Sequence, residues 1–322
     1  MSRIIFFGTP EFSVPSLEAL LESEHDVVAV VCQADRPKGR GKKMQFPPVK
    51  ECALAAGVEV LQPLTLKKGT DEGEEFWRKY EAMDLDLGVV TAYGRILSNR
   101  ILRFPRGGFV NVHASLLPRW RGAAPIQRAI AAGDDETGVC LMDMIYALDA
   151  GDVYATAKCG IHSDDTGDAL TERLAQVGKE TLAAHLQDIL DEKLPKVPQL
   201  EEGICYADML HKGEAKLDWR QSAQQIHDHC RAMFSWPGTT TIFDEQALKI
   251  FASRVCDDVN KGNAQPGEVL FAQDELVVAC GEGVVAFADL QVPGKKRMAV
   301  KDAIRGRPIE KGTLLGDVQS TS

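Results

Sequence analysis

Short apolar segments alternate with helical patterns through the first 190 residues, and this alternation limits the possible folds more than any other feature. Residues 3–7 and 27–32 have the apolar, β-branched character of buried strands, and leucines at helical spacing lie between them. Strands are also predicted at 58–61, 87–92, 109–113, 139–144 and 153–158, and helices at 123–132 and 166–190. Because strands that alternate with helices usually pair in parallel, we expect an α/β fold with a Rossmann-like, mostly parallel sheet.

The character of the sequence changes after residue 190. The segment 191–206 contains two prolines and shows neither helical nor strand periodicity, so we interpret it as a linker. Beyond it, Ser222 and Gln225 form a capping-box pattern that predicts a helix. Short apolar runs then follow at 239–243, 248–253, 268–271, 276–279 and 284–290. We therefore predict two domains, 1–190 and 207–322, of which the second is a smaller, OB-like β-barrel.

Charge and cysteine content exclude several classes of function. The 322 residues carry a net charge of −10, which gives no general attraction to nucleic acid. The eight cysteines form no C-x-x-C pair or Cys/His cluster, so we expect neither a metal nor a disulfide framework. No stretch reaches the roughly 18 apolar residues of a membrane helix, and the apolar start is too short for a signal peptide. We expect a cytoplasmic monomer that does not bind membranes.

One stretch departs from the acidic average. Residues 35–43 contain five basic residues and a single acidic one. Such a concentration of charge is typical of a solvated surface loop or of a loop that binds anions. The basic residues are Arg36, Lys38, Arg40, Lys42 and Lys43.

Two common phosphate-binding motifs are absent. The first turn is Gly8-Thr9-Pro10 instead of G-x-G-x-x-G, and the proline removes a backbone N–H that a pyrophosphate would need. The glycines of the basic stretch lack the four-residue spacer and the Ser/Thr of a P-loop. A nicotinamide dehydrogenase and a P-loop NTPase are therefore disfavoured.

Polar residues interrupt the apolar strand 109–113 where a loop begins. Asn111 and His113 are two positions apart, so their side chains project from the same face of the strand, about 6–7 Å apart. Open α/β sheets bind ligands at the carboxyl ends of their strands. Asp149 joins two later strands, from where its carboxylate can reach the same crevice. A surface histidine and an ordinary turn aspartate are the alternatives for each residue alone, whereas together the three can stabilise an oxyanion and move a proton.

The N-x-H-x-S-L-L-P run at 111–118, followed by L-D-x-G at 148–151, resembles the signature of the folate-dependent formyltransferases. The resemblance extends along nearly the whole chain. The basic stretch 35–43 and the R-W-R-G-A-A-P-I-Q run at 119–127 are its more specific parts, and they resemble family members that act on initiator tRNA.

The resemblance implies the formyltransferase fold with a C-terminal tRNA-binding domain. It also implies transfer of the formyl group from 10-formyltetrahydrofolate to the α-amino group of methionine on initiator methionyl-tRNA, a step of translation initiation.

Roles for individual residues follow from the same resemblance. Asn111 and His113 would hold the oxyanion, and Asp149 would orient His113. The folate would lie beside Ser115, Leu116, Leu117 and Pro118. The tRNA would contact the five basic residues of 35–43.

Alternatives remain open at this point. A formyltransferase acting on an amino sugar nucleotide would share the Asn-His-Asp set, but it has no evident need for the basic stretch. A glycinamide ribonucleotide formyltransferase would normally lack the second domain. An RNA-binding module without catalysis would keep the basic stretch, but it would not explain the three polar residues.

Overall fold

The chain forms two compact units. The structure is a computed structural model that describes residues 1–38 and 43–316, without the side chains of Lys38, Lys43 and Glu72. The N-terminal unit comprises Met1–Pro125, Glu136–Gly160 and Thr171–Asp208, and the C-terminal unit comprises Ile126–Asp135, Ile161–Leu170 and Met209–Ser322. The domain boundaries predicted above stay a prediction.

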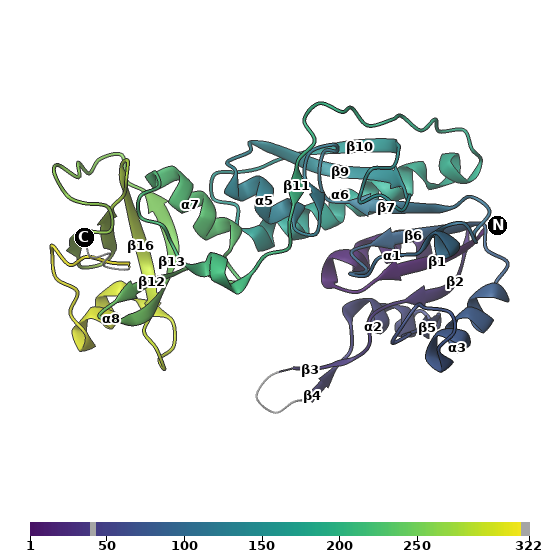
Figure 1. Cartoon of the computed structure of the whole chain (residues 1–322), viewed down its shortest axis with the longest axis horizontal. Coiled ribbons are helices and arrows are strands. Elements are labelled where there is room, and N and C mark those ends of the chain that lie inside the picture. Colours follow the sequence, from purple (N-terminus) through teal and green to yellow (C-terminus); the bar gives the residue numbers. More distant parts are fainter. Residues whose placement is uncertain (39–42, 317–322) are drawn as a thin grey trace. The chain divides into compact units, whose positions relative to one another are not determined.

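The N-terminal unit is built around a seven-stranded sheet (Figure 1). Its strands are β1 (Arg3–Gly8), β2 (Asp26–Val31), β5 (Glu59–Leu61), β6 (Leu87–Thr91), β7 (Phe109–His113), β9 (Glu136–Asp143) and β10 (Val153–Gly160). They lie in the order β10-β9-β7-β6-β1-β2-β5. The five strands from β7 to β5 pair in parallel, whereas β9 is antiparallel to both β7 and β10. The predicted mostly parallel α/β sheet is confirmed.

Helices cover both faces of this sheet. On one face, α6 (Gly167–Leu190) packs closely on β7 at Gly178, where a Cβ atom would lie only 3.0 Å from Val112 Cγ1. On the other face, the aromatic residues of α3 (Asp71–Glu81) pack with Phe109 of β7 in one buried cluster. Burial of each large apolar side chain contributes roughly 1.5–3 kcal/mol. The remaining helices of the chain's first half are η1 (Glu11–Ser13), α1 (Val14–Leu21), α2 (Pro48–Ala55), α4 (Asn99–Leu102) and α5 (Pro125–Ala131).

The basic stretch differs from the predicted loop. Two short strands, β3 (Arg36–Lys38) and β4 (Lys43–Gln45), pair antiparallel and form a hairpin. The base of the hairpin is well bonded, because Lys50 Nζ lies 2.8 Å from both Asp35 Oδ2 and Gln62 Oε1. Residues 39–42, including Arg40 and Lys42, lie outside the described residues.

The predicted linker 191–206 contains no helix, and its end pairs with the loop that follows β7. There, β11 (Tyr206–Ala207) is parallel to β8 (Arg121–Gly122). Earlier in the segment, Val197 exchanges two backbone hydrogen bonds of 2.8 and 2.9 Å with Val153 at the start of β10. The segment therefore contacts the sheet at two separate places.

The C-terminal unit contains a six-stranded antiparallel sheet in the order β12-β13-β16-β15-β14, with β17 paired to β16. Trp219 and Phe287 pack edge to face in its core, with ring centroids 6.0 Å apart. This half-barrel confirms the predicted β-rich second part. The elements are η2 (Lys212–Ala215), α7 (Ala223–Ala232), β12 (Thr240–Phe243), β13 (Gln246–Val255), β14 (Val269–Ala272), β15 (Leu276–Ala279), β16 (Val284–Gln291), β17 (Met298–Ala299) and α8 (Val300–Gly306).

Within the described part of the chain, no helix combines the length and the apolar character needed to cross a membrane.

Candidate active site

Two polar side chains lie at the end of β7, as the strand periodicity predicts. Asn111 is 9% exposed and His113 is 5% exposed, and both project from the face that carries Phe109. Among the residues that the structure describes, the Asn111 side-chain amide has no hydrogen-bond partner. Because buried amides are normally hydrogen-bonded, this one is available to a ligand.

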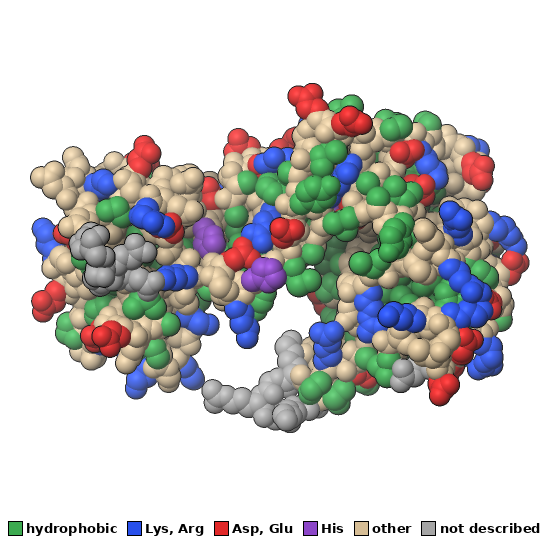
Figure 2. Space-filling view, in the orientation of Figure 1, with side chains coloured by type: hydrophobic (Ala, Val, Ile, Leu, Met, Phe, Trp, Pro, Cys, Tyr) green, Lys and Arg blue, Asp and Glu red, His purple; other side chains and the backbone are tan. Residues whose placement is uncertain are grey.

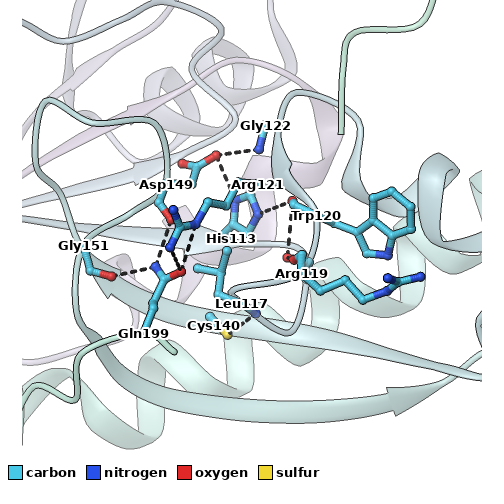
Figure 3. A network of polar contacts seen from close by, with 11 residues as sticks. His113, Leu117, Arg119, Trp120, Arg121, Gly122, Cys140, Asp149, Gly151 and Gln199 are labelled. Carbon is cyan, nitrogen blue, oxygen red and sulfur yellow. Dashed lines mark hydrogen bonds and ion pairs between the residues drawn. The ribbon is translucent and has the colours of Figure 1, made fainter. Parts of the chain in front are cut away.

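The hydrogen bonds of His113 define how its ring can act (Figure 3). Its Nε2 lies 3.0 Å from the backbone carbonyl oxygen of Trp120, and since a carbonyl only accepts, Nε2 carries a proton. Nδ1 faces Asp149, with 3.8 Å between Nδ1 and Oδ2. That distance is too long for a direct hydrogen bond and short enough for an ion pair or a bridging water. Nδ1 is therefore the ring nitrogen left for proton transfer.

The structure brings Asp149 to His113 through the turn between β9 and β10. Because β9 is antiparallel to β7, it ends beside Val110, and residues 144–152 must return toward His113. Asp149 has a φ of +44°, a left-handed conformation that aspartate tolerates. Gly151 is required in this turn, because a Cβ there would lie 1.9 Å from the carbonyl oxygen of Asp143.

A backbone N–H fixes the Asp149 carboxylate. Gly122 N donates to Asp149 Oδ2 at 2.8 Å, so the same oxygen faces both this N–H and the imidazole (Figure 3). Gly122 has a φ of +127°, and a Cβ there would lie 2.7 Å from the carbonyl oxygen of Ala207 in β11. The close approach of β8 and β11 thus requires glycine at the position that orients the carboxylate.

The four residues predicted to contact folate form the first part of the loop after β7. The fully buried Ser115 donates its hydroxyl hydrogen to the carbonyl oxygen of Arg119 at 2.7 Å. Leu116, Leu117 and Pro118 are half-buried. The serine hydroxyl therefore holds the loop together, while the three apolar side chains keep accessible surface.

Cys140 lies opposite His113 in the register of β7 and β9. Its Sγ accepts a hydrogen bond from Leu117 N at 3.4 Å. Burial raises the pKa of this thiol, so it stays protonated at neutral pH. Because the thiolate is the nucleophilic form of cysteine, Cys140 is a packing residue in this site.

The sequence analysis did not identify the residues whose hydrogen bonds support the backbone around His113 and Asp149. Cys205 contacts the loop after β7, Gln199 contacts the turn that carries Asp149, and Arg121 of that loop donates to Gln199. Gln199 and Cys205 belong to the segment interpreted as a linker, where no local pattern distinguishes them. Only the fold brings them to the site.

Of the predicted tRNA-binding residues, Arg36 and Lys38 lie on β3 and Lys43 lies on β4. Arg36 is exposed and donates to Gln33 Oε1 at 2.6 Å, and it has no carboxylate partner among the described residues. The side chains of Lys38 and Lys43, like Arg40 and Lys42, lie outside the description. In the space-filling view, blue Lys and Arg side chains are spread over the described surface among hydrophobic and acidic ones (Figure 2).

Groups of His, Cys, Asp and Glu that would suit a metal ion were sought throughout the described ranges, and none of three or more members was found there.

Known proteins resemble both units. The formyl transferase family model matches residues 2–186, and the model of the formyl transferase C-terminal domain matches residues 209–308. A methionyl-tRNA formyltransferase of Sorangium cellulosum is 44% identical, covering 98% of this chain and 99% of that protein. One from Methylococcus capsulatus is also 44% identical, with the same coverage.

A solved structure shows the same fold at a greater evolutionary distance. The N-formyltransferase of Helicobacter canadensis, in complex with folinic acid and dTDP-3-aminofucose, superposes with a TM-score of 0.67. It is 17% identical, and the match covers 89% of this chain and 99% of that one. With a family model over each part and relatives of this identity along almost its full length, the chain belongs to the formyl transferase family.

Proposed function

We propose that this protein transfers the formyl group of 10-formyltetrahydrofolate to the α-amino group of methionine on initiator methionyl-tRNA. The arrangement of the site is the observation that supports this chemistry: His113 and Asp149 approach to 3.8 Å, and on the same strand face the amide of Asn111 has no hydrogen-bond partner in the described part of the chain. The choice of acceptor is supported by the relatives that are 44% identical and carry the name methionyl-tRNA formyltransferase.

The reaction needs no covalent enzyme intermediate. The folate supplies a formyl carbon that an amine can attack. An α-amino group has a pKa of about 7.7, so a useful fraction is neutral at physiological pH. A bond forms between the amine nitrogen and the formyl carbon, the bond from that carbon to the folate nitrogen breaks, and one proton passes from the amine to the departing nitrogen.

Three side chains of this protein act on the charges that develop. The Asn111 amide donates a hydrogen bond to the formyl oxygen as it gains negative charge. His113, protonated at Nδ1, shares that charge and carries the proton. Asp149 orients the ring, because its carboxylate faces Nδ1 while the Nε2 proton is held by the carbonyl oxygen of Trp120.

The donor and the acceptor bind at different elements. The folate contacts the loop after β7 through Leu116, Leu117 and Pro118, and Ser115 positions this loop from beneath. The basic residues Arg36, Lys38, Arg40, Lys42 and Lys43 contact tRNA phosphates. The C-terminal unit supplies further tRNA contacts.

An acceptor comparison tests the reaction. The protein is incubated with 10-formyltetrahydrofolate and charged initiator tRNA, an amino sugar nucleotide, or no acceptor. Formyl transfer to the tRNA alone is expected. Transfer to the sugar nucleotide alone would replace the proposed acceptor, and transfer to neither would overturn the proposal.

Single-turnover rates test the three residues. Asn111→Ala removes an oxyanion donor and is expected to cost on the order of 10²–10³ in rate. His113→Ala and Asp149→Ala remove proton transfer and are expected to cost roughly 10²–10⁴. Circular dichroism should show folded protein in each case. Wild-type rates in all three variants would contradict the assignment.

A further inference from the structure

The segment 199–207 joins the two units in sequence and contacts the candidate active site directly. Its first residue, Gln199, is half-buried, whereas the next residue, Leu200, is 72% exposed. Gln199 Nε2 donates to the backbone carbonyl oxygens of Asp149 at 2.8 Å and Gly151 at 2.7 Å (Figure 3). Both amide hydrogens are therefore used on the turn that carries the catalytic carboxylate.

The other end of the same amide binds a buried cation. Gln199 Oε1 accepts from Arg121 Nε at 3.0 Å and from a terminal guanidinium nitrogen at 2.7 Å. Arg121 is 8% exposed, and no carboxylate within the described residues lies in ion-pair distance of it. A buried charged group needs hydrogen-bond partners, and Gln199 supplies them. Arg121 immediately precedes Gly122, whose N–H holds Asp149 Oδ2.

The end of the segment contacts the residues that hold His113. Cys205 Sγ accepts from Trp120 N at 3.2 Å, and the Cys205 carbonyl oxygen accepts from Arg121 N at 3.0 Å. Trp120 is the residue whose carbonyl oxygen fixes His113 Nε2. The segment thus contacts the supports of both members of the His113–Asp149 pair.

We infer that Gln199 is a positioning residue for this reaction: it holds the 149–151 turn and Arg121 so that the Asp149 carboxylate faces His113. The inference rests on the proposed function of Asp149. Gln199 acts through the backbone of the turn and is not itself assigned a contact with substrate. Its effect should therefore appear in turnover and should disappear when Asp149 is absent.

The first test is the variant Gln199→Ala, assayed with full-length protein. A misplacement of about 1 Å in a catalytic group can cost on the order of 10²-fold, so kcat is expected to fall roughly 10–100-fold. KM for the tRNA and for the folate should stay unchanged. Leu200→Ala, at the exposed neighbouring position, is the matched control and should behave as wild type. An unchanged kcat in folded Gln199→Ala overturns the inference.

The variant Gln199→Glu separates the two ends of the amide. It keeps an acceptor for Arg121 but loses both donors to the turn, and it keeps the size of the side chain. If the donors position Asp149, its kcat falls as far as that of Gln199→Ala. A wild-type kcat in Gln199→Glu would show that the turn contacts do not matter and would overturn the inference, even if Gln199→Ala fails to fold.

A double-mutant cycle with Asp149→Ala shows whether Gln199 acts through the carboxylate. Residues that act as a unit are non-additive, so adding Gln199→Ala to Asp149→Ala should cause no further loss of kcat. A full additional loss would contradict the inference. If Asp149→Ala alone keeps the wild-type kcat, the proposed function fails instead, which keeps the two failures distinct.

Discussion

The site at the end of β7 and the β3–β4 hairpin carry the two halves of the proposed function, and they are built in opposite ways. His113 and Asp149 are largely buried, and each is held by a backbone group, the carbonyl oxygen of Trp120 and the N–H of Gly122 respectively. Arg36 on the hairpin is exposed, and its one hydrogen-bond partner within the described ranges is the neutral side-chain amide of Gln33. A site that acts on one carbon atom needs fixed geometry, whereas contacts to a polyanion need accessible charge.

The contrast does not extend to the base of the hairpin. Asp35, Lys50 and Gln62 form a bonded network there, and Lys50 Nζ also lies 4.0 Å from the ring centroid of Phe46. Strand β3, which carries Arg36, therefore starts from a hydrogen-bonded base. Both regions thus contain residues that are fixed by hydrogen bonds. They differ in their functional side chains: His113 and Asp149 are buried and held by the backbone, whereas Arg36 is exposed.

Among the substitutions that test this contrast between the two regions, the largest effect is expected at Gly122, a glycine that the backbone geometry of the site requires. In Gly122→Ala, the new Cβ would meet the carbonyl oxygen of Ala207 at 2.7 Å and the backbone would be strained at a φ of +127°. We expect activity to fall by more than about 10²-fold, because the N–H that holds Asp149 moves. Steady-state kinetics measures this loss, and thermal unfolding should show a cost of about 1–3 kcal/mol.

Gly57→Ala is the control for backbone strain, because Gly57 has a φ of +74° with no atom within 4 Å of a Cβ. It should reduce stability without changing kcat. If Gly122→Ala retains wild-type activity, the site does not need the Gly122 N–H to hold the Asp149 carboxylate in a fixed position, and the contrast with the exposed Arg36 is wrong on this point.

An intermediate effect is expected from the basic stretch 35–43. Replacing Arg40 and Lys42 by alanine removes two charges that are proposed to contact phosphates, so KM for tRNA should rise far more than KM for the folate. The slope of log K against log salt should become shallower by about 0.7–0.9 for each lost contact. Lys158→Ala, which removes an exposed lysine paired with Glu136, is the control. Equal changes in both KM values would contradict the proposed role of the basic stretch.

The smallest effect is expected at the base of the hairpin and depends on pH. Hydrogen bonds from Lys50 and Gln62 hold the pKa of Asp35 below its usual value. Because the folded pKa lies below the unfolded value of about 3.9, the carboxylate stabilises the fold above that pH and loses this contribution as the pH falls through the folded pKa.

Asp35→Asn should therefore lower the unfolding temperature at pH 7, with a cost of at most about 1 kcal/mol for this partly exposed pair. Thermal unfolding between pH 7 and pH 3 measures the difference from wild type, which should shrink toward the acid end. A difference that is the same at every pH would show that the charge of Asp35 contributes nothing.

Much of the fold was predictable because local patterns specify it. Strand 109–113 coincides with β7 and strand 276–279 with β15. The Thr166 hydroxyl oxygen accepts from Ala169 N at 3.2 Å at the start of α6, and the Ser222 capping box is present. These features depend on residues within one or two turns of each other.

Other features were missed for physical reasons. Helix α3 was not predicted, although its Thr70 cap and its aromatic residues at 76, 77 and 80 are a helical signal. The pairing of Asn111 with His113 follows from strand periodicity, whereas Asp149 reaches them only through a turn that doubles back. Gln199 contacts Asp149 and Arg121, which lie 50 and 78 positions away in the sequence. The local sequence of the linker therefore could not predict these contacts.

The two hydrogen bonds between Val153 and Val197 have a consequence for the behaviour of the protein in solution. Strand β10 is the last strand of the sheet, and such strands can recruit a second copy of the same chain. Val197 occupies the beginning of that strand. Detaching the connecting segment would therefore free the backbone N–H and carbonyl of Val153 at this edge, so the segment that contains Gln199 also caps one backbone pair of an edge strand.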